Sequence, residues 1–174
     1  FRGMELVVQN RTPEDAAQIV ERICGVCPVS HAHASSIAGD KAYGITISNN
    51  ARIVRNLLEG AQFLHSHILW LYNLAALDYV NPLNALQANV DDAYAVALEN
   101  GLALHSDLNQ LYEKLAAFAD NGQLSIFSGN WFDADGGEAY VDNPEANLIL
   151  TSHYLEALKM QARSSEMAAL LGGK

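Results

Sequence analysis

The segment from Ser48 to Pro82 constrains the fold more than any other part of the sequence. Ser48-Asn49-Asn50 offers side chains that cap helix starts, and apolar residues then recur at helical spacing until Pro82. At a rise of ~1.5 Å per residue, such a helix is roughly 45 Å long. Apolar side chains cover much of its circumference. We therefore expect this helix to be buried in a protein body larger than the one this chain could form alone.

The rest of the sequence also predicts helices. Thr12-Pro13 is a typical helix start, and the helix that follows is expected to run to about Ile23. Pro28 opens a second helix towards Gly44. Further predictions are a helix over 91–120, an irregular loop over Gly122–Gly137, a helix from Asn143 to Met167, and short strands at Glu5–Val8 and Ile45–Ile47. We therefore predict an all-α fold of long helices with a little irregular or short-strand structure near the N-terminus.

The net charge, the apolar runs and the two ends of the sequence limit the kinds of protein and partner that we expect. A formal net charge of −10 repels nucleic acid and anionic membranes, so neither is an expected partner. The most apolar run, Ile68–Leu77, is too short for a membrane span. The chain opens on Phe1-Arg2-Gly3 without a secretory leader and ends on Gly172-Gly173-Lys174. We expect residues 1–174 to be a single-domain fragment of a longer protein, truncated at both ends.

The stretch ERICGVCPVSHAHASS holds the only two cysteines of the sequence. Cys24 lies at the end of the first predicted helix, and Cys27 lies just before Pro28. Two intervening residues let both sulfurs reach one metal ion. His31, one helical turn beyond Cys27, is a candidate third ligand, and the helix start is expected to favour a thiolate at Cys27.

Several kinds of site remain open for a bare cysteine pair. Zinc is the default, although a structural zinc site needs a fourth ligand. A thioredoxin-like redox pair requires a strand before Cys24, and none is expected there. A c-type haem site is excluded, because it requires a histidine where Pro28 stands. The two residues could also be buried small side chains without a ligand.

The longer string RICGVCPVSH, Arg22–His31, resembles the first cysteine motif of nickel–iron hydrogenase large subunits. The resemblance extends to FRGMELVVQNRTPEDA, to the long segment 49–86, and to NLILTSHYLEALKMQAR. It therefore covers nearly the whole chain at consistent spacing. It implies a helical large-subunit portion that contributes to a Ni–Fe centre, whose iron carries carbon monoxide and cyanide and which oxidises or evolves dihydrogen.

The resemblance also implies roles for single residues. Cys24 would be a terminal nickel thiolate and Cys27 a thiolate that bridges nickel and iron, and soft thiolates suit both metals. His31 would be a second-shell donor near the bridging sulfur. Glu5 matches a magnesium-binding carboxylate, and Arg22 would hold the turn or a neighbouring acid.

The family pattern is incomplete here. Many relatives are rich in histidine after the histidine pair that His65 and His67 match, but this sequence continues WLYNLAAL, which leaves a proton relay along that helix open. His65 and His67 could instead be polar residues on the outer or subunit-facing side of the helix. The second cysteine pair of the family is absent, so the resemblance implies the N-terminal portion of a large subunit.

The same resemblance implies partners and location. An iron–sulfur small subunit would receive the electrons, because this chain has no spare cysteines for clusters. A periplasmic location is expected, with membrane association only through partner subunits, and a cytoplasmic location is the alternative. Two other readings are a non-catalytic relative, such as a respiratory-complex-type subunit, and a small helical zinc-binding module.

Overall fold

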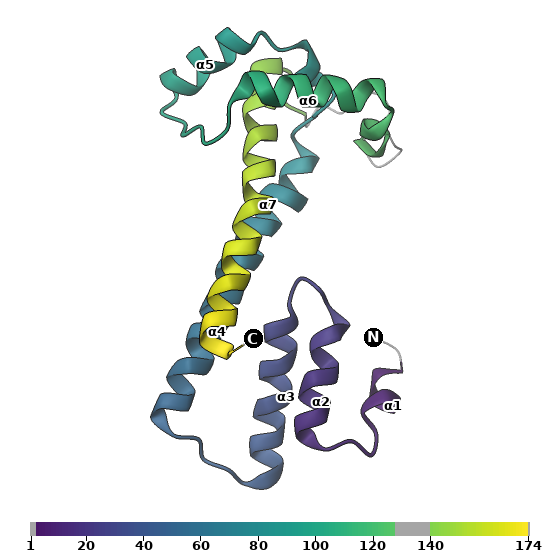
Figure 1. Cartoon of the computed structure of the whole chain (residues 1–174), viewed down its shortest axis with the longest axis vertical. Coiled ribbons are helices and arrows are strands. Elements are labelled where there is room, and N and C mark those ends of the chain that lie inside the picture. The colour runs from purple at the N-terminus through teal and green to yellow at the C-terminus, as the bar shows by residue number, and fades with distance from the viewer. Residues whose placement is uncertain (1–2, 128–139, 174) are drawn as a thin grey trace. The chain divides into compact units, whose positions relative to one another are not determined.

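A computed structural model describes residues 3–127 and 140–173, and every regular element within these ranges is helical (Figure 1). The prediction of an all-α fold is confirmed. The greater part of the loop expected over Gly122–Gly137 lies outside the described residues. The chain forms two compact units: unit 1 comprises Phe1–His67 with Gln161–Lys174, and unit 2 comprises Ile68–Met160. The assignment of residues 1–174 to a single domain stays a prediction.

Unit 1 begins with two helices, α1 (Met4–Val8) and α2 (Pro13–Val20), and α2 continues into a 3-10 turn over Glu21–Ile23. The predicted start of α2 is confirmed, since Thr12 Oγ1 accepts a hydrogen bond from the Asp15 backbone N–H at 3.1 Å. The strand entertained at Glu5–Val8 is wrong. Helical hydrogen bonds form there instead, and the Gly3 carbonyl accepts from Leu6 and Val7 N–H.

Helix α3 (Pro28–Tyr43) confirms the second predicted helix. It ends at Gly44, whose φ of 67° is the left-handed conformation that glycine adopts most easily. Residues 45–47 do not form the suggested strand. α2 and α3 approach closely at Gly39, where an added Cβ would lie 3.4 Å from the Pro13 Cβ.

The long helix predicted up to Pro82 forms, but it does not stay regular. Helix α4 (Asn49–Ile68) is followed, in unit 2, by a π-helical segment over Leu69–Leu74 and a 3-10 turn over Ala75–Asp78. Asn73 is nearly buried in the π segment, and its Nδ2 donates to the Tyr154 carbonyl at 3.0 Å. A buried polar side chain thus marks the departure from α geometry.

Unit 2 contains α5 (Val90–Glu99), α6 (Leu108–Asp120) and the first part of α7 (Pro144–Gly172), together with short 3-10 turns at Asn84–Gln87 and Gln123–Phe127. The helical structure predicted over 91–120 forms as two helices, because the chain leaves helical geometry after α5, where Gly101 has a φ of 62°, and returns to it at α6. The buried core of this unit consists of small and branched apolar residues: Ala85, Ala88, Ala93, Ala97, Leu108, Leu111, Leu115, Leu124, Leu148 and Ile149. None of the described helices is long and apolar enough to span a bilayer.

Asp107 starts α6, and its side chain predicts a pH effect. Its carboxylate accepts from the backbone N–H groups of Asn109, at 2.8 Å, and of Gln110, and these bonds lower the pKa of Asp107 from its ordinary value of 3.8. A carboxyl whose pKa is lower in the folded state stabilises the fold above its unfolded pKa and loses that effect as pH falls through the folded value.

We therefore expect the first-turn amides of α6 to lose protection from hydrogen exchange when the pH drops below about 4, after correction for the intrinsic exchange rate. In Asp107→Asn, which caps a helix without titrating, this acid-dependent loss should disappear. An unchanged pH profile in that variant would assign the effect to other carboxyls.

Candidate metal centre

Three side chains with metal-ligating atoms meet at the turn between α2 and α3. One ligand atom each from Cys24, Cys27 and His31 lie within 4.8 Å of one another. Cys24 follows the 3-10 turn in an extended conformation, Cys27 is the residue before Pro28, and the His31 N–H donates to the Cys27 carbonyl at 3.3 Å. The turn thus brings the two sulfurs and the imidazole close together, as the spacing of the three residues in the sequence predicted.

The two thiols differ in their tendency to lose a proton. Both are free and half-buried. A hydrogen bond from the Cys27 thiol, followed by backbone N–H bonds from Val26 and Cys27, lowers the pKa of Cys24. Donation to Cys24, then burial and the nearby negative charge, raise the pKa of Cys27. In the metal-free pair the thiol–thiol hydrogen bond thus favours a thiolate at Cys24, and the thiolate expected at Cys27 from the helix start stays a prediction.

The donor set fits a thiolate-bound transition metal. Two sulfurs and an imidazole suit nickel, low-spin iron and zinc better than magnesium or calcium. A bound cation favours deprotonation of both cysteines, which offsets the raised pKa of Cys27. Three donors leave a four-coordinate site incomplete, so a metal bound here needs further ligands from elsewhere.

Helix α4 contacts the turn through polar side chains that the sequence analysis did not single out. Gln62, only 6% exposed, donates through Nε2 to the Val26 carbonyl at 2.8 Å and to Ser66 Oγ at 2.9 Å. Glu59 accepts from Ser30 Oγ at 2.7 Å and lies 3.2 Å from His33 Nδ1. The spacing of three between Glu59 and Gln62, which places both on one helix face, is the only hint in the sequence.

A cavity of about 170 Å³ lies beside the turn in unit 1. Its walls are formed by Gly25, Val26, Pro28, Val29, Ala61, Gln62, His65, Ser164, Ser165 and Ala168. The Nδ1 atom of His65 is buried without a hydrogen-bond partner among the described residues, and burial lowers the pKa of this imidazole. His65 thus lines this cavity, whereas His67 is exposed and its Nδ1 lies 2.8 Å from the Phe63 carbonyl.

The other two predicted site residues lie outside the three-residue cluster. Arg22 contacts the acid beside it, with 3.2 Å between its Nη1 and the Glu21 Oε2. Glu5 is exposed on α1. Its assignment to magnesium and the assignment of Arg22 to holding the turn stay predictions.

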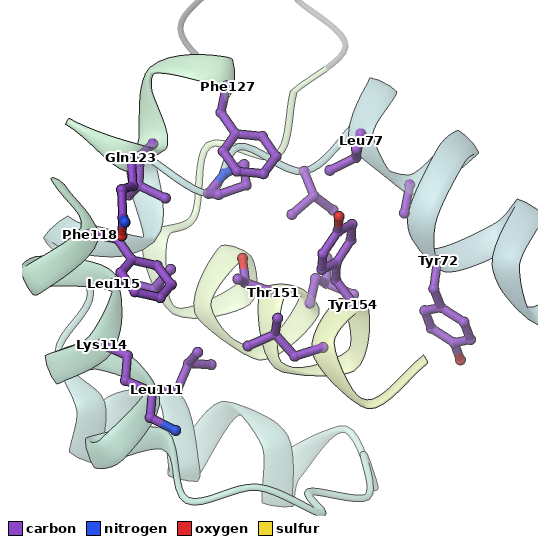
Figure 2. A pocket seen from close by; sticks show the side chains of 16 residues that line it. Tyr72, Leu77, Leu111, Lys114, Leu115, Phe118, Gln123, Phe127, Thr151 and Tyr154 are labelled. Carbon is purple, nitrogen blue, oxygen red and sulfur yellow. The ribbon is translucent and has the colours of Figure 1, made fainter. Parts of the chain in front are cut away.

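A larger cavity in unit 2 is unsuited to metal binding. It has a volume of about 270 Å³ and is enclosed mainly by aromatic and aliphatic side chains, among them Phe118, Phe127 and Tyr154 (Figure 2). Among the described residues that line it, Lys114 is the only charged one, and none is a cysteine or a carboxylate. The metal-capable group and this apolar cavity are therefore separate features.

Comparison with solved structures shows that the helical arrangement is a known one. The NiFeSe hydrogenase of Dm. baculatum matches with a TM-score of 0.64 and 34% identity, over 100% of this chain and 28% of that chain. A variant of the NiFeSe hydrogenase from Desulfovibrio vulgaris Hildenborough matches with a TM-score of 0.66 and 33% identity, over 100% of this chain and 27% of that chain.

Curated sequences give the same result. The "Hydrogenase-2 large chain" of Escherichia coli (strain K12) is 40% identical over 100% of this chain and 31% of its own length. The "Uptake hydrogenase large subunit" of Rhodobacter capsulatus is 38% identical, again over the whole chain and 29% of its own length. The chain therefore spans somewhat less than a third of these relatives. The family model described as "Nickel-dependent hydrogenase" matches residues 2–174, and the chain belongs to the nickel-dependent hydrogenase large-subunit family.

Proposed function

We propose that this chain supplies the first cysteine pair of a Ni–Fe centre in the catalytic large subunit of a hydrogenase, which oxidises or evolves dihydrogen. The observation that carries the proposal is the convergence of Cys24, Cys27 and His31 within 4.8 Å, in a chain matched almost end to end by the nickel-dependent hydrogenase model. Bound nickel and iron, the latter with carbon monoxide and cyanide ligands, supply the site where dihydrogen is cleaved or formed.

The residues of the turn bind and position the metals. Cys24 would be the terminal nickel thiolate, which the backbone N–H groups of Val26 and Cys27 would stabilise. Cys27 would supply the thiolate shared by nickel and iron, and His31 would donate a hydrogen bond near that sulfur and tune its basicity. Arg22 holds the turn or a neighbouring acid, and Glu5 binds magnesium.

A partner subunit completes the reaction. Both cysteines of these 174 residues are assigned to the metal centre, so this part of the large subunit has none for electron-carrying clusters. An iron–sulfur small subunit therefore accepts or supplies the electrons, in agreement with the "large chain" and "large subunit" names of the relatives. The enzyme is periplasmic and reaches the membrane only through partner subunits.

Metal analysis and infrared spectroscopy of the complete large subunit, produced with its small subunit, test the proposal. We expect one nickel and one iron at the site and infrared bands of iron-bound carbonyl and cyanide. Stoichiometric zinc without nickel or iron would instead identify a helical zinc-binding module. Absence of all three metals would identify a non-catalytic relative of the respiratory-complex type.

A further inference from the structure

The peptide group between Val26 and Cys27 joins the metal-binding turn to α4. Its carbonyl accepts the 2.8 Å hydrogen bond from Gln62 Nε2, and its N–H donates to Cys24 Sγ at 3.3 Å. Because a peptide group is planar, its carbonyl and its N–H turn together. Whatever fixes the carbonyl therefore also fixes the direction in which the N–H points.

Gln62 is built to fix that carbonyl. Its side chain is buried, so the amide has little contact with water that could replace a lost bond. The second hydrogen bond, to Ser66 Oγ at 2.9 Å, holds the same amide nitrogen from one turn further along α4. The Val26 side chain is 41% exposed, so its own packing contributes little to the position of the turn.

A neighbouring contact holds the helix that carries Cys27. One turn before Gln62, Glu59 binds Ser30 and His33 of α3. Since residues three apart share a helix face, one face of α4 holds both the turn and the start of α3. Glu59 thus fixes the start of α3, and Gln62 prevents rotation of the Val26–Cys27 peptide that precedes it.

We propose that Gln62 is a positioning residue of the metal centre, which acts through the Val26–Cys27 peptide to aim a backbone N–H at the sulfur of Cys24. A hydrogen bond to the carbonyl polarises the peptide and strengthens donation by its N–H. Hydrogen bonds to a metal-bound thiolate draw electron density from the sulfur and raise the reduction potential of the centre. The identity of the metals in this inference rests on the proposed function. The two hydrogen bonds, from Gln62 to Val26 and from the Cys27 N–H to Cys24, do not depend on it.

The test is Gln62→Met in the complete large subunit with its small subunit. Methionine matches the length of glutamine but donates no hydrogen bond. Two readouts follow. The Cys27 amide should exchange its hydrogen about tenfold faster, as expected for loss of a bond worth roughly 1.4 kcal/mol. In the metal-loaded enzyme, the infrared bands of the iron ligands should shift and the midpoint potential should become more negative.

Gln18→Met is the matched control, because Gln18 is exposed on α2 in the same unit and should leave both readouts unchanged. If Gln62→Met prevents assembly, Gln62→Leu also removes the amide donor without adding a charge or a new donor, and should give the same two changes. Unaltered Cys27 exchange and unaltered infrared bands in a metal-loaded variant would overturn the proposal. If the wild-type protein binds no nickel or iron, the proposed function fails, while the Cys27 exchange still decides the role of Gln62.

Discussion

Cys27→Ser in the complete large subunit should lower hydrogen uptake by more than about 100-fold, the upper end of the loss expected for an outer-shell residue. A serine hydroxyl is a hard ligand that stays protonated at neutral pH, so it replaces a bridging thiolate poorly. Nickel and iron contents should fall together, because the proposed bridge is shared by both metals. Dye-coupled hydrogen uptake and metal analysis of the purified complex measure the two effects.

Two further variants, one with a smaller expected effect and one with none, provide comparisons for Cys27→Ser. His31→Gln removes an imidazole proposed to act on the bridging sulfur from the second shell, so activity should fall by about 10- to 100-fold while metals are retained. Lys41→Ala, at an exposed position in the last turn of the same helix, should behave as the wild type. Full activity and full metal content in Cys27→Ser would remove Cys27 from the centre.

Leu148→Ala should produce the largest loss of local stability in unit 2. Leu148 is fully buried in α7, within the same core cluster as Leu108 and Leu111. Truncation of a buried leucine costs about 3 kcal/mol, because apolar contact is lost and a cavity remains. That cost corresponds to roughly 100-fold faster hydrogen exchange at the amides of α6 and α7. Hydrogen exchange with mass spectrometry of the complete protein resolves these helices.

Leu98→Ala provides the comparison for this effect. The same atoms are removed from a side chain that is 83% exposed on α5, so exchange should change little. Equal effects of the two substitutions would show that the described core does not set the local stability of unit 2.

Local sequence signals predicted much of this fold. Thr12 and Pro28 start helices because a capping hydroxyl and a fixed φ act within one turn of the chain. Gly44 ends α3 for an equally local reason, its positive φ. The cysteine cluster was also predictable, since two residues between Cys24 and Cys27 allow few arrangements other than convergence of the sulfurs.

Features that depend on other parts of the chain were not predictable. The contact of Gln62 with Val26 joins residues 36 positions apart, and nothing near either residue announces it. Which thiol loses its proton first depends on the direction of the Cys27 thiol, and sequence does not specify that direction.

The close approach at Gly39 limits how this part of the protein can evolve. An alanine methyl would lie in van der Waals contact with Pro13, and a longer side chain that pointed the same way would push α3 away from α2. Because α3 carries Cys27 at its leading end, such a push would tilt the helix and carry one sulfur away from the other. Among descendants that keep both thiols in use, selection should admit only glycine or alanine at position 39, although that residue binds nothing itself.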